Sequence, residues 1–224
     1  MPDNIQSMIV SRVDALSESV RTIVKTASVL GRKFSVKVLS SMLKNKSIKG
    51  ELNNREYSTL IAPINEINYI FRHAIIRESL YQLQMKEKIG NMHILAGECM
   101  ESLYKRKIES KAGELAYHFE NGGDSAKAEK YLLLAGEYAV KKYMNLNALD
   151  YYSRSLNYSK EIAVIINTHE IQGNIYKHLW KWDEALKEYF SLTEQALLEW
   201  LYDNYTGMNT KESALYGRLV KKVV

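Results

Sequence analysis

Apolar residues recur every three or four positions along most of this chain, which is the spacing of an amphipathic helix. Between residues 20 and 30 the apolar stripe consists of Val20, Ile23, Val24, Ala27 and Leu30. Ser17 precedes this stripe and Gly31 follows it. Serine favours the start of a helix and glycine favours its end. The pattern therefore predicts a helix between Ser17 and Gly31.

Residues 1–45 are predicted to form three short helices. Besides the helix above, Pro2 and Asp3 open one helix and Ser35 precedes another. Short amphipathic helices in this number indicate a small domain of helix-turn-helix type. Tyr69-Ile70-Phe71 favours a strand, because aromatic and β-branched residues suit a pleated surface. A strand after three helices is the order found in a winged helix. Residues 44–68 begin as a polar, basic stretch, and the apolar residues that follow, Tyr57, Leu60, Ile61 and Ile64, are interrupted by Pro63, so their pattern predicts no single element.

The helical period returns after Arg72. It predicts one helix through residues 75–83 and another through residues 92–103. The charged segment Lys105–Ser110 is expected to be a linker. We therefore expect two domains, a winged-helix-like domain with linking helices over residues 1–104 and a repeat domain over residues 111–224.

Small and large residues recur at a fixed spacing in the second half. Three registers with intervals of 12, 4 and 3 residues are Ala116, Ala128, Leu132 and Ala135; Gly136, Ala148, Tyr152 and Ser155; and Gly173, Ala185, Tyr189 and Leu192. This is the tetratricopeptide pattern, in which small residues let two antiparallel helices cross closely. Because the first two registers start only 20 residues apart, one helix from about Asp124 to Tyr143 is expected to serve both. We expect about three repeats, the last one truncated.

Composition and charge narrow the class of protein. The 224 residues are 46% hydrophobic and 25% charged, as in folded globular chains. A single cysteine, Cys99, excludes a disulfide within the chain and is expected to be a buried structural thiol. No apolar run reaches the roughly 18 residues of a spanning helix, so we expect a cytoplasmic protein with no membrane partner. Residues 1–110 carry 17 basic and 11 acidic side chains, which suits either an acidic partner or a solvated lysine-rich surface.

Several motifs in order resemble one family. Residues 26–34 are similar to its A-S-V-x-G-R-x-F stretch, and residues 71–81 resemble its F-R-H-A-x-x-R-E-x-x-Y motif. Residues 115–128 resemble its first helical repeat. The family is the STAND-type signalling ATPases, in which a P-loop ATPase precedes a winged-helix-like domain and tetratricopeptide repeats. The resemblance implies an all-α chain, with a winged-helix-like domain followed by a tetratricopeptide-type α-solenoid. The sequence has no G-x-x-x-x-G-K-[ST], so we expect no nucleotide cradle in it.

No group of residues marks catalytic chemistry. The five histidines lack metal-ligand spacing, so we expect no enzyme activity, no cofactor and no metal site. Arg72, His73 and Arg77 are candidate partner-binding residues, which would contact an ATPase domain or its nucleotide. The alternative for this group is anchoring of the domain to its neighbour. Asn174, beside Gly173, is the candidate in the repeats, where it would hydrogen-bond a peptide backbone.

The expected function is regulatory protein–protein interaction without catalysis. The chain would be a segment of a multidomain signalling ATPase, with an ATPase domain in cis or in trans as its partner. The alternative is a DNA-binding winged-helix regulator that uses the basic region 35–62. That region contains Lys37, Lys44, Lys46, Lys49 and Arg55. Binding of this kind weakens steeply with salt. The partner, the signal and the output domain are not encoded in any motif.

Overall fold

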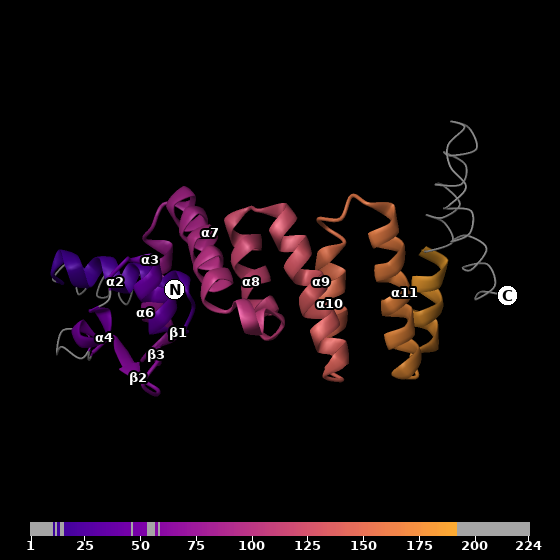
Figure 1. Ribbon diagram of the computed structural model, residues 1–224, viewed down its shortest axis with the longest axis horizontal. Helices are drawn as coiled ribbons and strands as arrows, with labels where there is room; N and C mark the ends of the chain where they lie inside the picture. The colour runs from indigo at the N-terminus through magenta and orange to yellow at the C-terminus, as the bar shows by residue number, and fades with distance from the viewer. Residues whose placement is uncertain are drawn as a thin grey trace. The chain divides into compact units, whose positions relative to one another are not determined.

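The computed structural model describes residues 11, 13, 16–45, 47–52, 57 and 59–191. Helices dominate this part of the chain, which confirms the all-α class (Figure 1). The chain divides into two compact units, Met1–Ser125 and Ala126–Val224. The helix expected after Pro2 and Asp3 lies outside the described residues. No described helix is both long enough and apolar enough to cross a membrane.

The first unit combines short helices, a small sheet and two longer helices. Its elements are α2 (Glu18–Val29), β1 (Lys33–Ser35), α3 (Val36–Met42), α4 (Ile48–Glu51), β2 (Ile61–Pro63), β3 (Asn68–Phe71), α6 (Ala74–Gln82), α7 (Lys86–Leu103), the 3-10 helix η1 (Lys105–Lys107) and α8 (Ile108–Gly122). Helix α2 lies between Ser17 and Gly31, as predicted. Gly31 has a φ of 106°, which glycine adopts without steric cost. Helix α3 follows Ser35, also as predicted.

A three-stranded antiparallel sheet joins distant parts of the first unit. Strand β3 lies between β1 and β2, with Phe34 opposite Tyr69 and Ala62 opposite Ile70. The predicted strand at residues 69–71 is confirmed as part of β3. The apolar pattern does not predict β1 or β2, because each has only three residues. Pro63 is the last residue of β2, an edge strand, where a missing N–H is tolerated.

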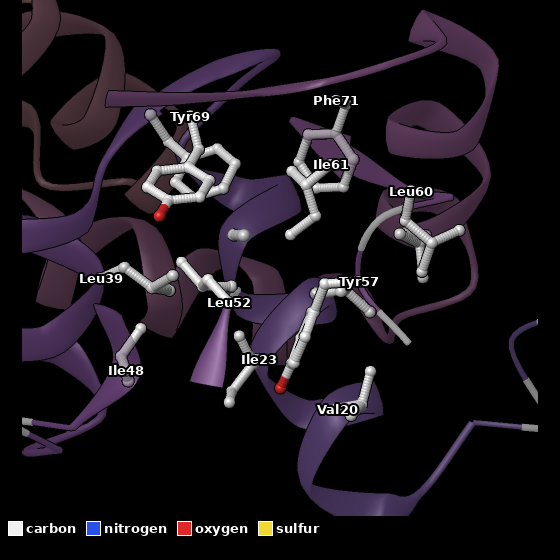
Figure 2. Packing of buried hydrophobic residues seen from close by; sticks show 14 of the residues in the cluster. Val20, Ile23, Leu39, Ile48, Leu52, Tyr57, Leu60, Ile61, Tyr69 and Phe71 are labelled. Carbon is white, nitrogen blue, oxygen red and sulfur yellow. The ribbon is translucent and has the colours of Figure 1, made fainter. Parts of the chain in front are cut away.

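Side chains from the short helices and the sheet form one apolar core (Figure 2). Figure 2 labels ten of its members: Val20, Ile23, Leu39, Ile48, Leu52, Tyr57, Leu60, Ile61, Tyr69 and Phe71. Phe34 packs on this cluster with its ring centroid 5.6 Å from that of Phe71. Leu39 and Phe71 are completely buried, so the core closes the space between α3 and the sheet. This burial holds the three-residue strands in place, because such strands contribute few ladder bonds of their own.

Helices α7 and α8 cross closely at a glycine. A Cβ added at Gly97 would lie 2.6 Å from Cζ of Phe119, so the ring occupies the place of the missing side chain. The expected linker at residues 105–110 is wrong. Only Tyr104 and the 3-10 helix Lys105–Lys107 separate the two helices, and α8 already includes Ser110. The charged side chains of Lys105, Arg106 and Lys107 are exposed to solvent, which explains why a helical segment can carry them.

The second unit is built from helices in its described part. These are α9 (Ser125–Lys141), α10 (Asn145–Ser155), α11 (Ile162–His178) and a helical segment over residues 182–191. Helix α9 starts at the boundary of the two units and is one continuous helix, as the shared register predicts. Gly123, just before it, has a φ of 79° and ends α8 as a glycine C-cap.

The two registers that begin with glycine each place an aromatic ring on that glycine. A Cβ at Gly136 would lie 2.8 Å from Cζ of Tyr152, and a Cβ at Gly173 would lie 2.6 Å from Cε1 of Tyr189. Both pairs are 16 residues apart in sequence. Helices that meet in this way can approach closely, because no side chain keeps the backbones apart. Leu192, the last position of the third register, lies outside the described residues.

The boundary between the two compact units differs from the domain boundary predicted from the sequence. The sequence places the change of domain between residues 104 and 111, whereas the units meet at Ser125. Helix α8 belongs to the first unit because its Phe119 packs against Gly97 of α7. Gly122 of α8 also approaches α7, since a Cβ there would lie 2.7 Å from Cγ1 of Ile94. The division into a winged-helix-like domain and a repeat domain stays a prediction.

Candidate functional site

The residues singled out in the F-R-H motif lie around the start of α6. Arg72 and His73 are exposed and follow directly after β3. His73 is the residue before α6, in an extended conformation, and its side chain makes no capping hydrogen bond. The four-residue spacing of His73 and Arg77 predicts that both lie on one helix, one turn apart, but only Arg77 lies within α6. The exposure of Arg72 and His73 is what a partner-binding role requires.

Arg77 points back into its own unit. Its Nε donates to the backbone oxygen of Ser28 over 2.8 Å, at the C-terminal end of α2. A guanidinium suits this place because the last carbonyls of a helix carry partial negative charge. Gln84 donates to the backbone oxygen of Lys25 and to the hydroxyl of Ser28, both over 3.3 Å. The contacts of Arg77 thus join α6 to α2 within the domain.

The guanidinium of Arg77 also begins a chain of polar aromatic side chains. It lies 4.6 Å from the ring centroid of Tyr81 and donates to Glu78 over 3.0 Å. The hydroxyl of Tyr81 lies 3.0 Å from Nε2 of His93. His93 Nδ1 then lies 2.9 Å from His118 Nδ1. Three helices, α6, α7 and α8, are therefore connected through one hydrogen-bonded line of side chains.

The two histidines at the centre of this line are buried. His93 is completely buried and His118 is 3% exposed. The ring of Tyr117 meets both imidazoles edge-on, with centroid distances of 5.5 and 5.4 Å. Burial, reinforced by the positive charge of Arg77, lowers the pKa of His93 to about 4. Burial, followed by the effect of His93, lowers the pKa of His118 to about 3. Both rings are therefore neutral at pH 7.

Because both imidazole rings are neutral, each can donate one hydrogen bond and accept one. Each imidazole has one N–H, so one histidine donates to the other and the second ring accepts. Tyr81 keeps its proton because burial raises the pKa of its hydroxyl. This line of side chains therefore links three helices. Its members do not form a pair of general base and nucleophile. Within the described residues, no group of three histidine, cysteine or carboxylate side chains is arranged to hold a metal ion.

The spacing of histidines along the chain does not reveal the pair His93 and His118. His93 and His118 are 25 residues apart, on separate helices, and only the close crossing of α7 and α8 brings them together. The available signal was that both lie among apolar residues of their helices. A histidine in such a position needs a buried polar partner.

Asn174 lies on α11 and is partly buried. Its Oδ1 accepts a hydrogen bond from the hydroxyl of Tyr189 over 3.0 Å. One turn and a half earlier, His169 Nδ1 lies 2.6 Å from a carboxylate oxygen of Glu188. Gln172 donates from Nε2 to the hydroxyl of Ser153 over 2.8 Å. Polar side chains of α11 therefore bind both neighbouring helices, and the carbonyl of Asn174 is already engaged.

The basic stretch proposed for DNA binding is scattered over short elements. Lys37 on α3, Lys44 after it and Lys49 on α4 are exposed, whereas Lys46 and Arg55 lie outside the described residues. Helix α3 has only seven residues. The hairpin loop from Ile64 to Ile67 carries Glu66 and no lysine or arginine. Among the described residues, the exposed lysines of this stretch therefore lie on separate short elements, and the hairpin loop adds no basic side chain to them.

Comparison with known proteins gives one distant similarity. No protein-family model matches the chain, and no solved structure matches it. Over 159 residues the chain is 28% identical to the peroxide stress-activated histidine kinase mak3 of Schizosaccharomyces pombe. The match covers 65% of this chain and 7% of that protein, so the chain is similar to a small part of a much longer relative.

Proposed function

We propose that this chain is a noncatalytic segment that binds proteins and regulates a multidomain signalling protein. The observation that carries this proposal is the recurrent glycine–tyrosine crossing, at Gly136 with Tyr152 and at Gly173 with Tyr189. A repeated crossing of this kind builds stacks of helix pairs, and such stacks present extended surfaces for other proteins. The second unit is, in this proposal, a tetratricopeptide-type solenoid.

The first unit fits a winged-helix-like domain in this proposal. Its order of short helices followed by a β2–β3 hairpin, with β1 on the far side of β3, supports this assignment. Arg72 and His73 are exposed at the junction of β3 and α6, where a neighbouring ATPase domain would contact them. Arg77 acts indirectly, because its contacts with Ser28 and Tyr81 fix α6 in place.

The similarity to part of a stress-activated histidine kinase supports a signalling context. The matched part is a small fraction of that long protein, which is the size expected of one regulatory segment within it. The long relative and the helix-pair stack together favour a scaffold over an enzyme. The residues described above add no nucleophile–base pair to that picture.

A site-specific crosslinking experiment tests the proposal. A photoreactive amino acid is placed at Asn174 on α11, the candidate partner-binding residue of the repeats, and at Asp150 on α10 as the matched control. Asp150 is exposed, with 61% of its side chain accessible. We expect a discrete protein adduct from position 174 and none from position 150. Equal labelling from both positions, or ATP hydrolysis by the purified chain, would contradict the proposal.

DNA binding is the weaker alternative, and the same purified chain tests it. A mobility-shift assay with duplex DNA at low salt is expected to show no complex. The reason is that the hairpin loop carries Glu66 in place of basic residues. A complex that dissociates steeply with added salt would instead favour the DNA-binding reading.

A further inference from the structure

Equivalent turns of the helix pairs contain a left-handed residue at the same place. The turn residue comes seven positions after the small residue of each register: Gly123 after Ala116, Tyr143 after Gly136, and Trp180 after Gly173. Their φ angles are 79°, 57° and 60°. Glycine adopts this backbone freely, whereas a bulky side chain rarely does. Two of the three turns therefore place a large aromatic residue where glycine would fit better.

The side chains of these two aromatic residues are largely exposed to solvent. Tyr143 is 89% exposed and Trp180 is 79% exposed. Trp180 contacts the ring of Trp182 edge-on, and Trp182 is itself 51% exposed. Leu146, close to Tyr143, is 72% exposed. A left-handed backbone at a residue whose large side chain is mostly exposed points to a function at the surface.

The two turns face the same end of the second unit. Helices α9, α10 and α11 run alternately down and up, so the turn after α9 and the turn after α11 share one end (Figure 1). The connection between α10 and α11 lies at the other end (Figure 1). We call the shared end the aromatic end and define it by its exposed apolar residues. These are Tyr143, Met144, Leu146, Trp180 and Trp182.

Basic side chains accompany these residues. Exposed lysines lie at the ends of α9 and α11 and in the turns, at Lys141, Lys142, Lys177 and Lys181. The acidic residues that face the same end are Asp183 and Glu184, and Glu184 lies 3.5 Å from Lys181. Lysines therefore outnumber carboxylates there. The aromatic end is both apolar and positively charged.

We propose that the aromatic end attaches the chain peripherally to a membrane surface rich in anionic lipids. Tryptophan and tyrosine favour the lipid–water interface, because each ring is apolar with one polar group. The lysines beside them meet lipid phosphates. Tyr143 and Trp180 lie in two turns at one end of the second unit, and this arrangement suits a planar partner. This goes against the expectation of no membrane partner, which rested only on the lack of a spanning segment.

Vesicle binding by the full chain tests the proposal. The chain is mixed with phosphatidylcholine vesicles, with or without phosphatidylserine, and the bound fraction is measured by sedimentation. We expect binding to the phosphatidylserine vesicles, with a blue shift of tryptophan emission and weakening by salt. Absence of binding at low salt would overturn the proposal. So would capture of a protein through the same aromatic residues without any vesicle binding.

The decisive variant replaces Tyr143 and Trp180 together with glycine. Glycine suits both φ angles, so the variant keeps or gains thermal stability and its loss of binding does not reflect unfolding. We expect the vesicle partition coefficient to fall by about tenfold or more. The matched control is Phe190→Ser, which removes an aromatic residue that is 61% exposed, away from the turns on segment 182–191. Equal losses in the two variants would overturn the proposal.

Discussion

His93 Nδ1 and His118 Nδ1 lie 2.9 Å apart, so only one proton fits on the line between them. The pair is buried, and both rings fold in their neutral form. A second proton on this line would bring two N–H groups face to face. Full protonation of the pair is therefore incompatible with the packing of α7 against α8.

The histidine pair makes the first unit sensitive to acid. The folded pKa values, about 4 and about 3, lie below the ordinary value of 6.5, so the unfolded chain binds protons first as pH falls. The contribution of the pair to stability is present above pH 6.5 and is lost as the pH falls through the folded pKa values of about 4 and about 3. Each extra proton bound by the unfolded chain gives a slope of about 1.4 kcal/mol per pH unit.

Urea unfolding at several pH values measures this slope. His118→Gln is expected to flatten it, because one titrating group is removed from the buried pair. His178→Gln, which changes an exposed histidine outside the buried pair, is the matched control. A wild-type stability that stays constant between pH 7 and pH 5 would contradict this account.

Gly97→Ala is expected to destabilise the first unit. The added Cβ would lie 2.6 Å from Cζ of Phe119, a buried ring that has little room to move. Overpacking of this kind costs about 1–3 kcal/mol. Gly50→Ala is the control, since nothing lies within 4 Å of its added Cβ. The melting temperatures of both variants are measured by thermal unfolding. Equal melting temperatures would contradict the close crossing of α7 and α8.

Arg77→Gln is expected to have two effects. It loses the bond to Ser28 and the contact with Tyr81, which lowers the free energy of unfolding by about 1–3 kcal/mol. It also raises the pKa of His93, because the positive charge of Arg77 opposes protonation of that ring. Urea unfolding and an NMR titration of His93 measure the two effects. Arg106→Gln, at an exposed site, should change neither.

Cys99 is expected to resist thiol reagents in the folded chain. It is 9% exposed and lies on α7, so a reagent reaches it only when the helix opens. The labelling rate is therefore predicted to rise steeply with urea, in parallel with unfolding. Rapid labelling of the native chain would show that Cys99 is accessible and that this face of α7 is not packed.

The periodic helices could be predicted from the sequence because their apolar stripes face a core. Helix α2 and continuous helix α9 follow from spacing and from flanking serine and glycine residues. Strand β1 could not be predicted, since Phe34 is its only buried residue and its partner Tyr69 is 35 residues away. The short sheet exists because long-range packing holds it, which local propensity does not report.

Among the candidate site residues, too, local sequence predicts exposure but not contacts with distant elements. Exposure of Arg72 and His73 agrees with their place after a strand, but the inward course of Arg77 depends on where α2 ends. The histidine pair depends on the crossing of two helices, which no spacing within one helix reveals. Tyr143 and Trp180 could be found in the sequence only by aligning the registers and comparing them with Gly123.

The central claim is that glycine–tyrosine crossings build the helix-pair stack, and a double-mutant cycle tests it most directly. The variants are Gly136→Ala, Tyr152→Leu and both together, compared by their free energies of unfolding. Because the added Cβ meets the ring of Tyr152, the smaller leucine should make room for it. We expect the double variant to lose about 1–2 kcal/mol less than the sum of the single losses. Strictly additive losses would contradict the claim.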